Sequence, residues 1–141
     1  MPCLCGVQFA YHVTTGSALP VIQRRGLLPV VTHINPGHGP VVWFGPLSTA
    51  LRYAPDREYP YILRFPLPTR SHQADRVEWV TPDEVPPESI EVYVGRGAAG
   101  LHKLYFIEDE EARLEHPALD AVEEGAKNPR SWRSIRKMKL S

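Results

Sequence analysis

Cysteines and two of the histidines occur in closely spaced pairs, so metal binding is the first chemistry to consider. Cys3 and Cys5 are separated by one residue, and His33 and His38 stand five apart in a segment rich in proline and glycine. Zinc sites take Cys and His ligands at short spacings, and a structural site needs four of them. The cysteine pair supplies half of such a set at most, and no carboxylate or cysteine lies beside the two histidines. We therefore expect ordinary loop histidines and no metal site.

Three other residues have side chains suited to catalysis or ligand binding: His12, Tyr53 and Glu78. Each also has an ordinary structural explanation. A histidine at a strand end is often a satisfied structural residue, and a tyrosine on a short amphipathic helix often belongs to the core. A lone glutamate usually stays in solvent. The residue types alone leave both interpretations open, so the elements that position them must decide.

Those elements are short, because 15 prolines divide the chain. A first strand is predicted over 9–13, where aromatic and β-branched residues gather. A helix is predicted over 17–25, with Ser17 as N-cap, Pro20 in the first turn and Gly26 at its end. A second short helix is predicted to begin at Leu47 and Ser48, with Ser48 as its cap, and to end before Pro55.

The rest of the chain is predicted to be mostly strand and loop. Further strands are predicted over 41–44, 61–65, 77–80, 90–94 and 104–107. Irregular segments are predicted over 28–40, 66–75, 81–87 and 95–100. The order β-α-β-α-β-β-β-β predicts an α+β domain with its helices early and its strands late.

The C-terminal segment divides by charge. Residues 108–124 have an acidic excess, whereas 127–139 carry six basic residues and no acid. Asn128 and Pro129 form a good N-cap and N1 pair, and Trp132, Ile135 and Met138 follow at helical spacing. A terminal helix is therefore predicted. Its basic face is expected to be solvated, with a nucleic-acid contact as the alternative.

Bulk composition indicates a single domain and names no partner. The chain has 141 residues, 43% of them apolar, and its 16 basic and 16 acidic residues cancel. No apolar run approaches the about 20 residues of a membrane span, and the first residues lack the pattern of a secretory signal. Two cysteines so close together make an ordinary structural disulfide unexpected, so a reducing cytoplasm is the expected location.

Three segments, in chain order, carry a resemblance to a known family. In the first, Tyr11-His12-Val13-Thr14 ends a strand and leads into a helix that stops at Arg25-Gly26-Leu27. In the second, Val42-Trp43-Phe44 precedes Leu47-Ser48-Thr49-Ala50-Leu51-Arg52-Tyr53-Ala54, which is similar to a Ser-x-x-Ala-x-x-Tyr helix. In the third, Val77-Glu78-Trp79-Val80 precedes Val85-Pro86-Pro87-Glu88-Ser89-Ile90. Together, residues 9–94 resemble the His-Tyr-Glu branch of the ADP-ribosyltransferases, which includes bacterial DNA-modifying toxins and poly(ADP-ribose) polymerases.

The resemblance implies two small, mostly antiparallel sheets around a cleft for NAD, with short flanking helices. Cleavage of the nicotinamide–ribose bond builds positive charge on the ribose, and Glu78 would stabilise that charge and hold a ribose hydroxyl. His12 would donate a hydrogen bond to the adenosine-side ribose, with help from Thr14. Tyr53 would stack on the nicotinamide ring, with Trp43 and Phe44 as the alternatives.

One departure from the family concerns the acceptor of the ADP-ribose. Several toxin branches place Glu or Gln two residues before the catalytic glutamate, where this chain has Arg76. A basic residue there suits an anionic acceptor such as nucleic acid, and Arg52 is placed to contribute from the second helix. The resemblance thus predicts a mono-ADP-ribosyltransferase that uses NAD to modify a macromolecule.

Two alternatives stay open. A related RNA 2′-phosphotransferase would need several arginines around the histidine, and Arg24, Arg25 and Arg52 match that set incompletely. A catalytically silent binding domain of the same fold is the other. Convergence of His12, Tyr53 and Glu78 on one cleft would favour an enzyme, and a Glu78 in open solvent would favour the silent domain.

Overall fold

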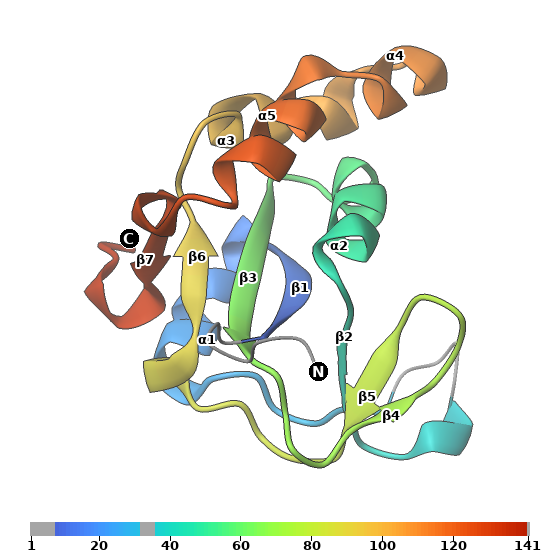
Figure 1. Cartoon of the computed structure of the whole chain (residues 1–141), viewed down its shortest axis with the longest axis vertical. Helices are drawn as coiled ribbons and strands as arrows, with labels where there is room; N and C mark the ends of the chain where they lie inside the picture. Colours follow the sequence, from blue (N-terminus) through green and yellow to red (C-terminus); the bar gives the residue numbers. More distant parts are fainter. Residues whose placement is uncertain (1–7, 32–35, 141) are drawn as a thin grey trace, which may run out of the picture.

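A computed structural model describes residues 8–31 and 36–140 of the chain, and it contains two small antiparallel sheets. The first sheet has the strand order β1-β3-β6-β7, and the second has the order β2-β5-β4 (Figure 1). The strands of the first sheet are β1 (Phe9–Thr15), β3 (Pro60–Pro66), β6 (Glu91–Tyr93) and β7 (Trp132–Ser134). Those of the second are β2 (Val42–Phe44), β4 (His72–Gln73) and β5 (Trp79–Thr81). The predicted α+β class is confirmed.

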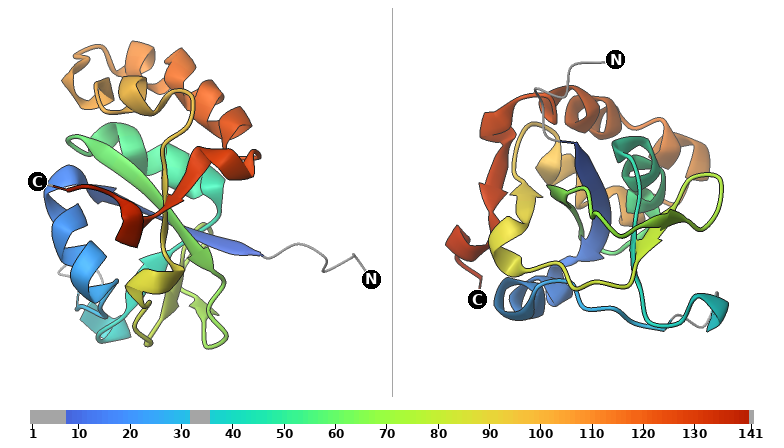
Figure 2. Two further views of the ribbon diagram at one scale, coloured as in Figure 1. Left: turned by 90° about the vertical axis from the view of Figure 1, so that its left-hand side faces the viewer. Right: turned by 60° about the horizontal axis from the view of Figure 1, so that its bottom comes forward.

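Helices cover both faces of the four-stranded sheet (Figures 1 and 2). The helices that do so are α1 (Leu19–Arg25), α2 (Leu47–Tyr53), α3 (Ala98–Leu101) and α5 (Pro117–Gly125), whereas α4 (Glu110–Leu114) has no buried residue. Side chains alternate across a strand, so each central strand feeds two cores. On β3, Leu63 and Phe65 pack with Leu19 and Ile22 of α1, whereas Ile62 packs on the opposite face among residues of α2, α3 and α5.

A backbone bridge joins the two sheets. Tyr11 of β1 and Gly45, directly after β2, exchange N–H···O hydrogen bonds of 2.8 and 3.0 Å. Gly45 lies so close to the chain before β5 that a Cβ there would approach the Val77 carbonyl oxygen to 2.8 Å. The absence of a side chain at Gly45 therefore lets β1, β2 and the segment before β5 converge.

The early elements lie close to the predicted positions, and Gly26 ends α1 with a φ of 77°. The predicted caps are wrong. Neither Ser17 nor Ser48 caps its helix, because the N-cap positions are Ala18 and Pro46, and no side-chain hydrogen bond is made at either.

The later elements correct the predicted order. The strand predicted over 104–107 is a 3₁₀ turn, Leu104–Phe106, and the glycine-rich segment before it contains α3. The predicted C-terminal helix is wrong: Asn128 caps only a 3₁₀ turn, and β7 follows and pairs with β6. The acidic segment forms α4 and α5, so helices are not confined to the first half.

Within the described ranges, no helix has the length and apolar character to cross a membrane. Cys3, Cys5 and His33 lie outside those ranges, so the structure does not bear on the interpretation of their pairs as metal ligands.

Candidate functional site

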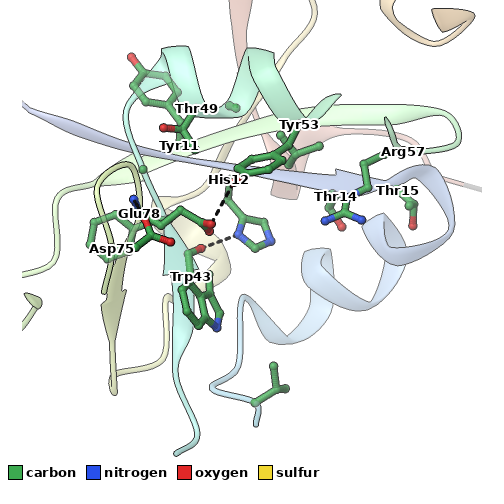
Figure 3. Close-up of a pocket in the computed structure, with 15 residues that line it drawn as sticks. Tyr11, His12, Thr14, Thr15, Trp43, Thr49, Tyr53, Arg57, Asp75 and Glu78 are labelled. Carbon is green, nitrogen blue, oxygen red and sulfur yellow. Dashed lines mark hydrogen bonds between the residues drawn. The ribbon is translucent and has the colours of Figure 1, made fainter. Parts of the chain in front are cut away.

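A cavity of about 710 Å³ lies where the two sheets meet, and its floor and walls come from four separate segments. Its volume is typical of sites for small molecules, which measure about 300–1,000 Å³. The lining residues from β1 and from the segments around β2 and α2 are Tyr11, His12, Val13, Thr14, Thr15, Val30, Trp43, Phe44, Gly45, Thr49, Ala50 and Tyr53. Arg57, Asp75 and Glu78 complete the lining (Figure 3).

His12 is half-buried on β1, and one ring nitrogen is already occupied. Its Nδ1 lies 2.7 Å from the backbone oxygen of Trp43. A carbonyl oxygen only accepts, so Nδ1 must carry a proton and donate. Burial lowers the pKa of His12 from its ordinary value of 6.5, which favours the neutral ring at pH 7. The other nitrogen, Nε2, then holds a lone pair, so His12 is an acceptor toward a ligand, the reverse of the predicted donor role.

Helix α2 presents Thr49 and Tyr53 to the cavity, one turn apart on the same face. The Thr49 hydroxyl donates to the Val77 carbonyl oxygen at 2.8 Å, which ties the helix to the chain before β5. One turn later, the Tyr53 hydroxyl donates to Glu78 Oε1 at 3.3 Å (Figure 3). Burial and the Glu78 carboxylate raise the pKa of Tyr53 from its ordinary value, so the phenol keeps its proton and stays a donor.

Glu78 is held by a tight turn between β4 and β5. The Asp75 carboxylate accepts hydrogen bonds from the backbone N–H groups of Val77 and Glu78, both at 2.8 Å. The Glu78 carbonyl oxygen accepts in return from the N–H groups of Ala74 and Asp75, at 2.9 and 3.2 Å. Every backbone polar group of Glu78 therefore has a partner, and its half-buried side chain is aimed into the cavity (Figure 3).

Burial, with a smaller contribution from the nearby Asp75 charge, raises the pKa of Glu78 above its ordinary 4.5. We predict that Asp75→Asn lowers this pKa. The Asn side-chain oxygen can still accept the two backbone N–H bonds, so the turn survives while the negative charge is lost. The pKa can be measured from the pH dependence of the Glu78 carboxyl chemical shift. An unchanged pKa in Asp75→Asn would show that the Asp75 charge does not act on Glu78.

The structure brings six of the predicted site residues together on this cavity: His12, Thr14, Trp43, Phe44, Tyr53 and Glu78. The aromatic residues among them differ in how far their side chains are exposed. Phe44 is 4% exposed and packs edge-on against Phe65 in the core, whereas Trp43 and Tyr53 are half-buried. Tyr53 and Trp43 are thus better placed than Phe44 to meet a planar ligand.

The two predicted acceptor residues, Arg52 and Arg76, do not line the cavity and are exposed. Two charged residues of the lining, Asp75 and Arg57, were not predicted. Asp75 stands three residues before Glu78, a spacing typical of a side chain that caps a turn, and that signal was available in the sequence. Arg57 follows α2 in a segment without a local pattern, and only the three-dimensional structure brings it to the cavity.

No protein-family model matches the chain, and no match is found among curated proteins or among solved structures. The resemblance of the three segments and the geometry of this cavity are therefore the two observations that bear on function.

Proposed function

We propose that this protein is an NAD-dependent ADP-ribosyltransferase with its active site in the cavity between the two sheets. The observation that supports this most is the convergence of His12, Tyr53 and Glu78. They come from β1, α2 and the turn before β5, yet all three line one cavity, and Tyr53 donates directly to Glu78. Each of the three segments that resemble the family thus contributes at least one of these residues to the site.

The reaction that this site would catalyse is cleavage of one glycosidic bond. The bond between ribose C1′ and the nicotinamide nitrogen breaks, and its electron pair leaves with the ring as neutral nicotinamide. Positive charge spreads over C1′ and the ring oxygen until a nucleophile on the acceptor, or water, adds to C1′ and loses a proton. Ionised Glu78, half-buried and oriented by Tyr53 and by its turn, would stabilise that charge where solvent screens it little.

The cavity supports each of the two alternatives less well. A Glu78 in open solvent would favour a silent domain, whereas this carboxylate is half-buried and hydrogen-bonded. An RNA 2′-phosphotransferase would need several arginines around His12, yet Arg24, Arg25 and Arg52 do not line the cavity, and Arg57 is the single arginine among the described lining residues. Transfer of ADP-ribose is the reaction that uses His12, Tyr53 and Glu78 together.

For the acceptor we favour an anionic macromolecule such as nucleic acid. Arg52 and Arg76 are exposed, and each is adjacent in sequence to a cavity residue, Tyr53 and Asp75 respectively. Guanidinium groups at such positions contact phosphates without reading sequence. Incubation with labelled NAD and, separately, protein, DNA and RNA tests this, because only the true acceptor becomes labelled.

We predict that NAD raises the melting temperature of the protein. At a concentration of about 100 times the dissociation constant, a ligand stabilises the folded state by about 2.7 kcal/mol. Each kcal/mol raises the Tm of a domain of this size by roughly 2–4 °C. Differential scanning fluorimetry over a series of NAD concentrations measures the shift. A folded sample whose Tm does not change in millimolar NAD would contradict the proposal.

A further inference from the structure

The charged groups of the cavity are separated along its length (Figure 3). The carboxylates of Asp75 and Glu78 lie at one end, and Arg57, Thr14 and Thr15 lie at the other, with His12 and Tyr53 between the two ends. Arg57 is the single lysine or arginine among the described residues that line the cavity. The site is therefore polarised, with an acidic end and a basic end.

The Arg57 guanidinium has no carboxylate partner among residues 8–31 and 36–140, in contrast to Arg64, Arg70, Arg113 and Arg136, which form ion pairs. The carboxylate next to it in sequence, Asp56, lies 3.7 Å from Arg113 instead. Within the described structure, no ion pair therefore neutralises the positive charge at this end. The field of that charge lowers the pKa of His12 and of Glu78, which favours the neutral imidazole and the ionised carboxylate.

The backbone that carries Arg57 is fixed on both sides. Its N–H donates to the Ala54 carbonyl oxygen at 3.1 Å, and Ala54 is completely buried. Two residues later, Tyr59 is held at a φ of 49°, and its carbonyl oxygen accepts from Gly16 at 3.1 Å. A non-glycine residue in this left-handed region is strained by about 1 kcal/mol or more, so the surrounding contacts must determine the path of the segment. That path brings the side chain of Arg57 over the end of β1 (Figure 3).

A guanidinium beside hydroxyl groups is a suitable donor set for phosphate oxygens. Arginine presents a planar fork of N–H donors that matches two phosphate oxygens, and threonine hydroxyls add single donors. The carboxylates at the opposite end exclude phosphate by repulsion and favour a cationic group. A ligand with a phosphate-bearing half and a cationic half therefore fits this cavity in one orientation.

We propose that Arg57, with Thr14 and Thr15, forms a diphosphate subsite that orients a nucleotide in the cavity. This rests on the proposed function for the identity of the nucleotide, NAD. In that case the diphosphate lies against Arg57 and the cationic nicotinamide end lies at Glu78. Arg57 is a binding residue in this assignment, and it sets which end of the ligand reaches the catalytic carboxylate.

The test compares Arg57→Gln and Arg57→Lys with a matched control. Arg133→Gln removes the same group from an exposed arginine on β7 that lines no part of the cavity.

Calorimetric titrations of these variants use three probes: inorganic pyrophosphate, ADP-ribose and nicotinamide. Loss of a charge-assisted hydrogen bond typically weakens binding by roughly 10- to 100-fold. We expect such a loss for pyrophosphate and ADP-ribose in Arg57→Gln, a smaller loss in Arg57→Lys, and unchanged affinity for nicotinamide. Arg133→Gln should bind all three probes as the wild type does.

Two outcomes would overturn the subsite. One is a wild type that binds neither pyrophosphate nor ADP-ribose, and the other is an Arg57→Gln variant that binds both as tightly as the wild type.

The same proteins, assayed for release of nicotinamide from NAD, separate this inference from the proposed function. Wild-type cleavage of NAD with no effect of Arg57→Gln on either probe removes the subsite alone. Arg57-dependent binding of pyrophosphate and ADP-ribose without any cleavage of NAD supports the subsite and removes the proposed transferase.

Discussion

Glu78→Gln is expected to lower the rate of NAD cleavage by a factor on the order of 10²–10³ while leaving NAD affinity nearly unchanged. The physical reason is that the carboxylate charge is needed mainly when positive charge develops on the ribose, which happens in the transition state. Glutamine has the same size, and its amide oxygen can still accept the Tyr53 hydroxyl, so the turn and the cavity should survive. The measurement is release of nicotinamide from NAD, because hydrolysis requires no knowledge of the acceptor.

The matched control is Glu84→Gln. Glu84 is exposed, makes no ion pair within the described residues and stands outside the cavity, yet its substitution changes the net charge by the same amount. Glu88 is a poorer control, because it pairs with Arg136 at 2.7 Å. If the wild type hydrolyses NAD and Glu78→Gln does so equally well, Glu78 is not the catalytic carboxylate. The correspondence of the third segment to the family would then be wrong, even if the fold were right.

The sequence was most informative where a local pattern and the tertiary structure agree. The apolar positions of 61–65 predict a strand, and β3 is the central strand whose alternate residues fill both cores. The segment that begins at Leu47 and Ser48 and ends before Pro55 predicts a helix, and the one-turn spacing of Thr49 and Tyr53 on that helix brings both to the cavity. The cavity residues that were predicted could be predicted because each of them lies on or beside an element with such a local pattern.

The C-terminal segment shows why the rest could not be predicted. Trp132, Ile135 and Met138 repeat at a spacing of three, which indicates a helix, but Trp132 is instead held in β7 against Tyr93 of β6. The Trp132 indole N–H donates to the Ala126 carbonyl oxygen at 3.0 Å, and this buried bond fixes the turn before the strand. Pairing with a strand about 40 residues away overrides a weak local preference, and spacing in one segment carries no information about it. Arg57 was missed because its segment has no local pattern, and only the tertiary structure brings it to the cavity.

Substitution of His12 is expected to have the second large effect on NAD binding. The two ring nitrogens of His12 have different partners, and two substitutions distinguish the role of one nitrogen from that of the other. Asparagine places a donor near the position of Nδ1, so His12→Asn can keep the bond to the Trp43 carbonyl oxygen while nothing replaces Nε2. We expect His12→Asn to retain a Tm close to that of the wild type and to weaken NAD binding by roughly 10-fold or more. Thermal denaturation and calorimetric titration with NAD give the two quantities on one protein.

His12→Gln makes the opposite exchange. Its longer side chain carries an acceptor near the position of Nε2 but leaves the Trp43 carbonyl oxygen without its donor, and an unpaired, partly buried oxygen costs about 1–3 kcal/mol. We therefore expect His12→Gln to melt at a lower temperature than His12→Asn and yet to bind NAD more tightly. The order of the two variants reverses between the two measurements only if Nδ1 is structural and Nε2 meets the ligand. A purely structural His12 would give equal NAD affinity in both variants and in the wild type, with only the melting temperatures changed.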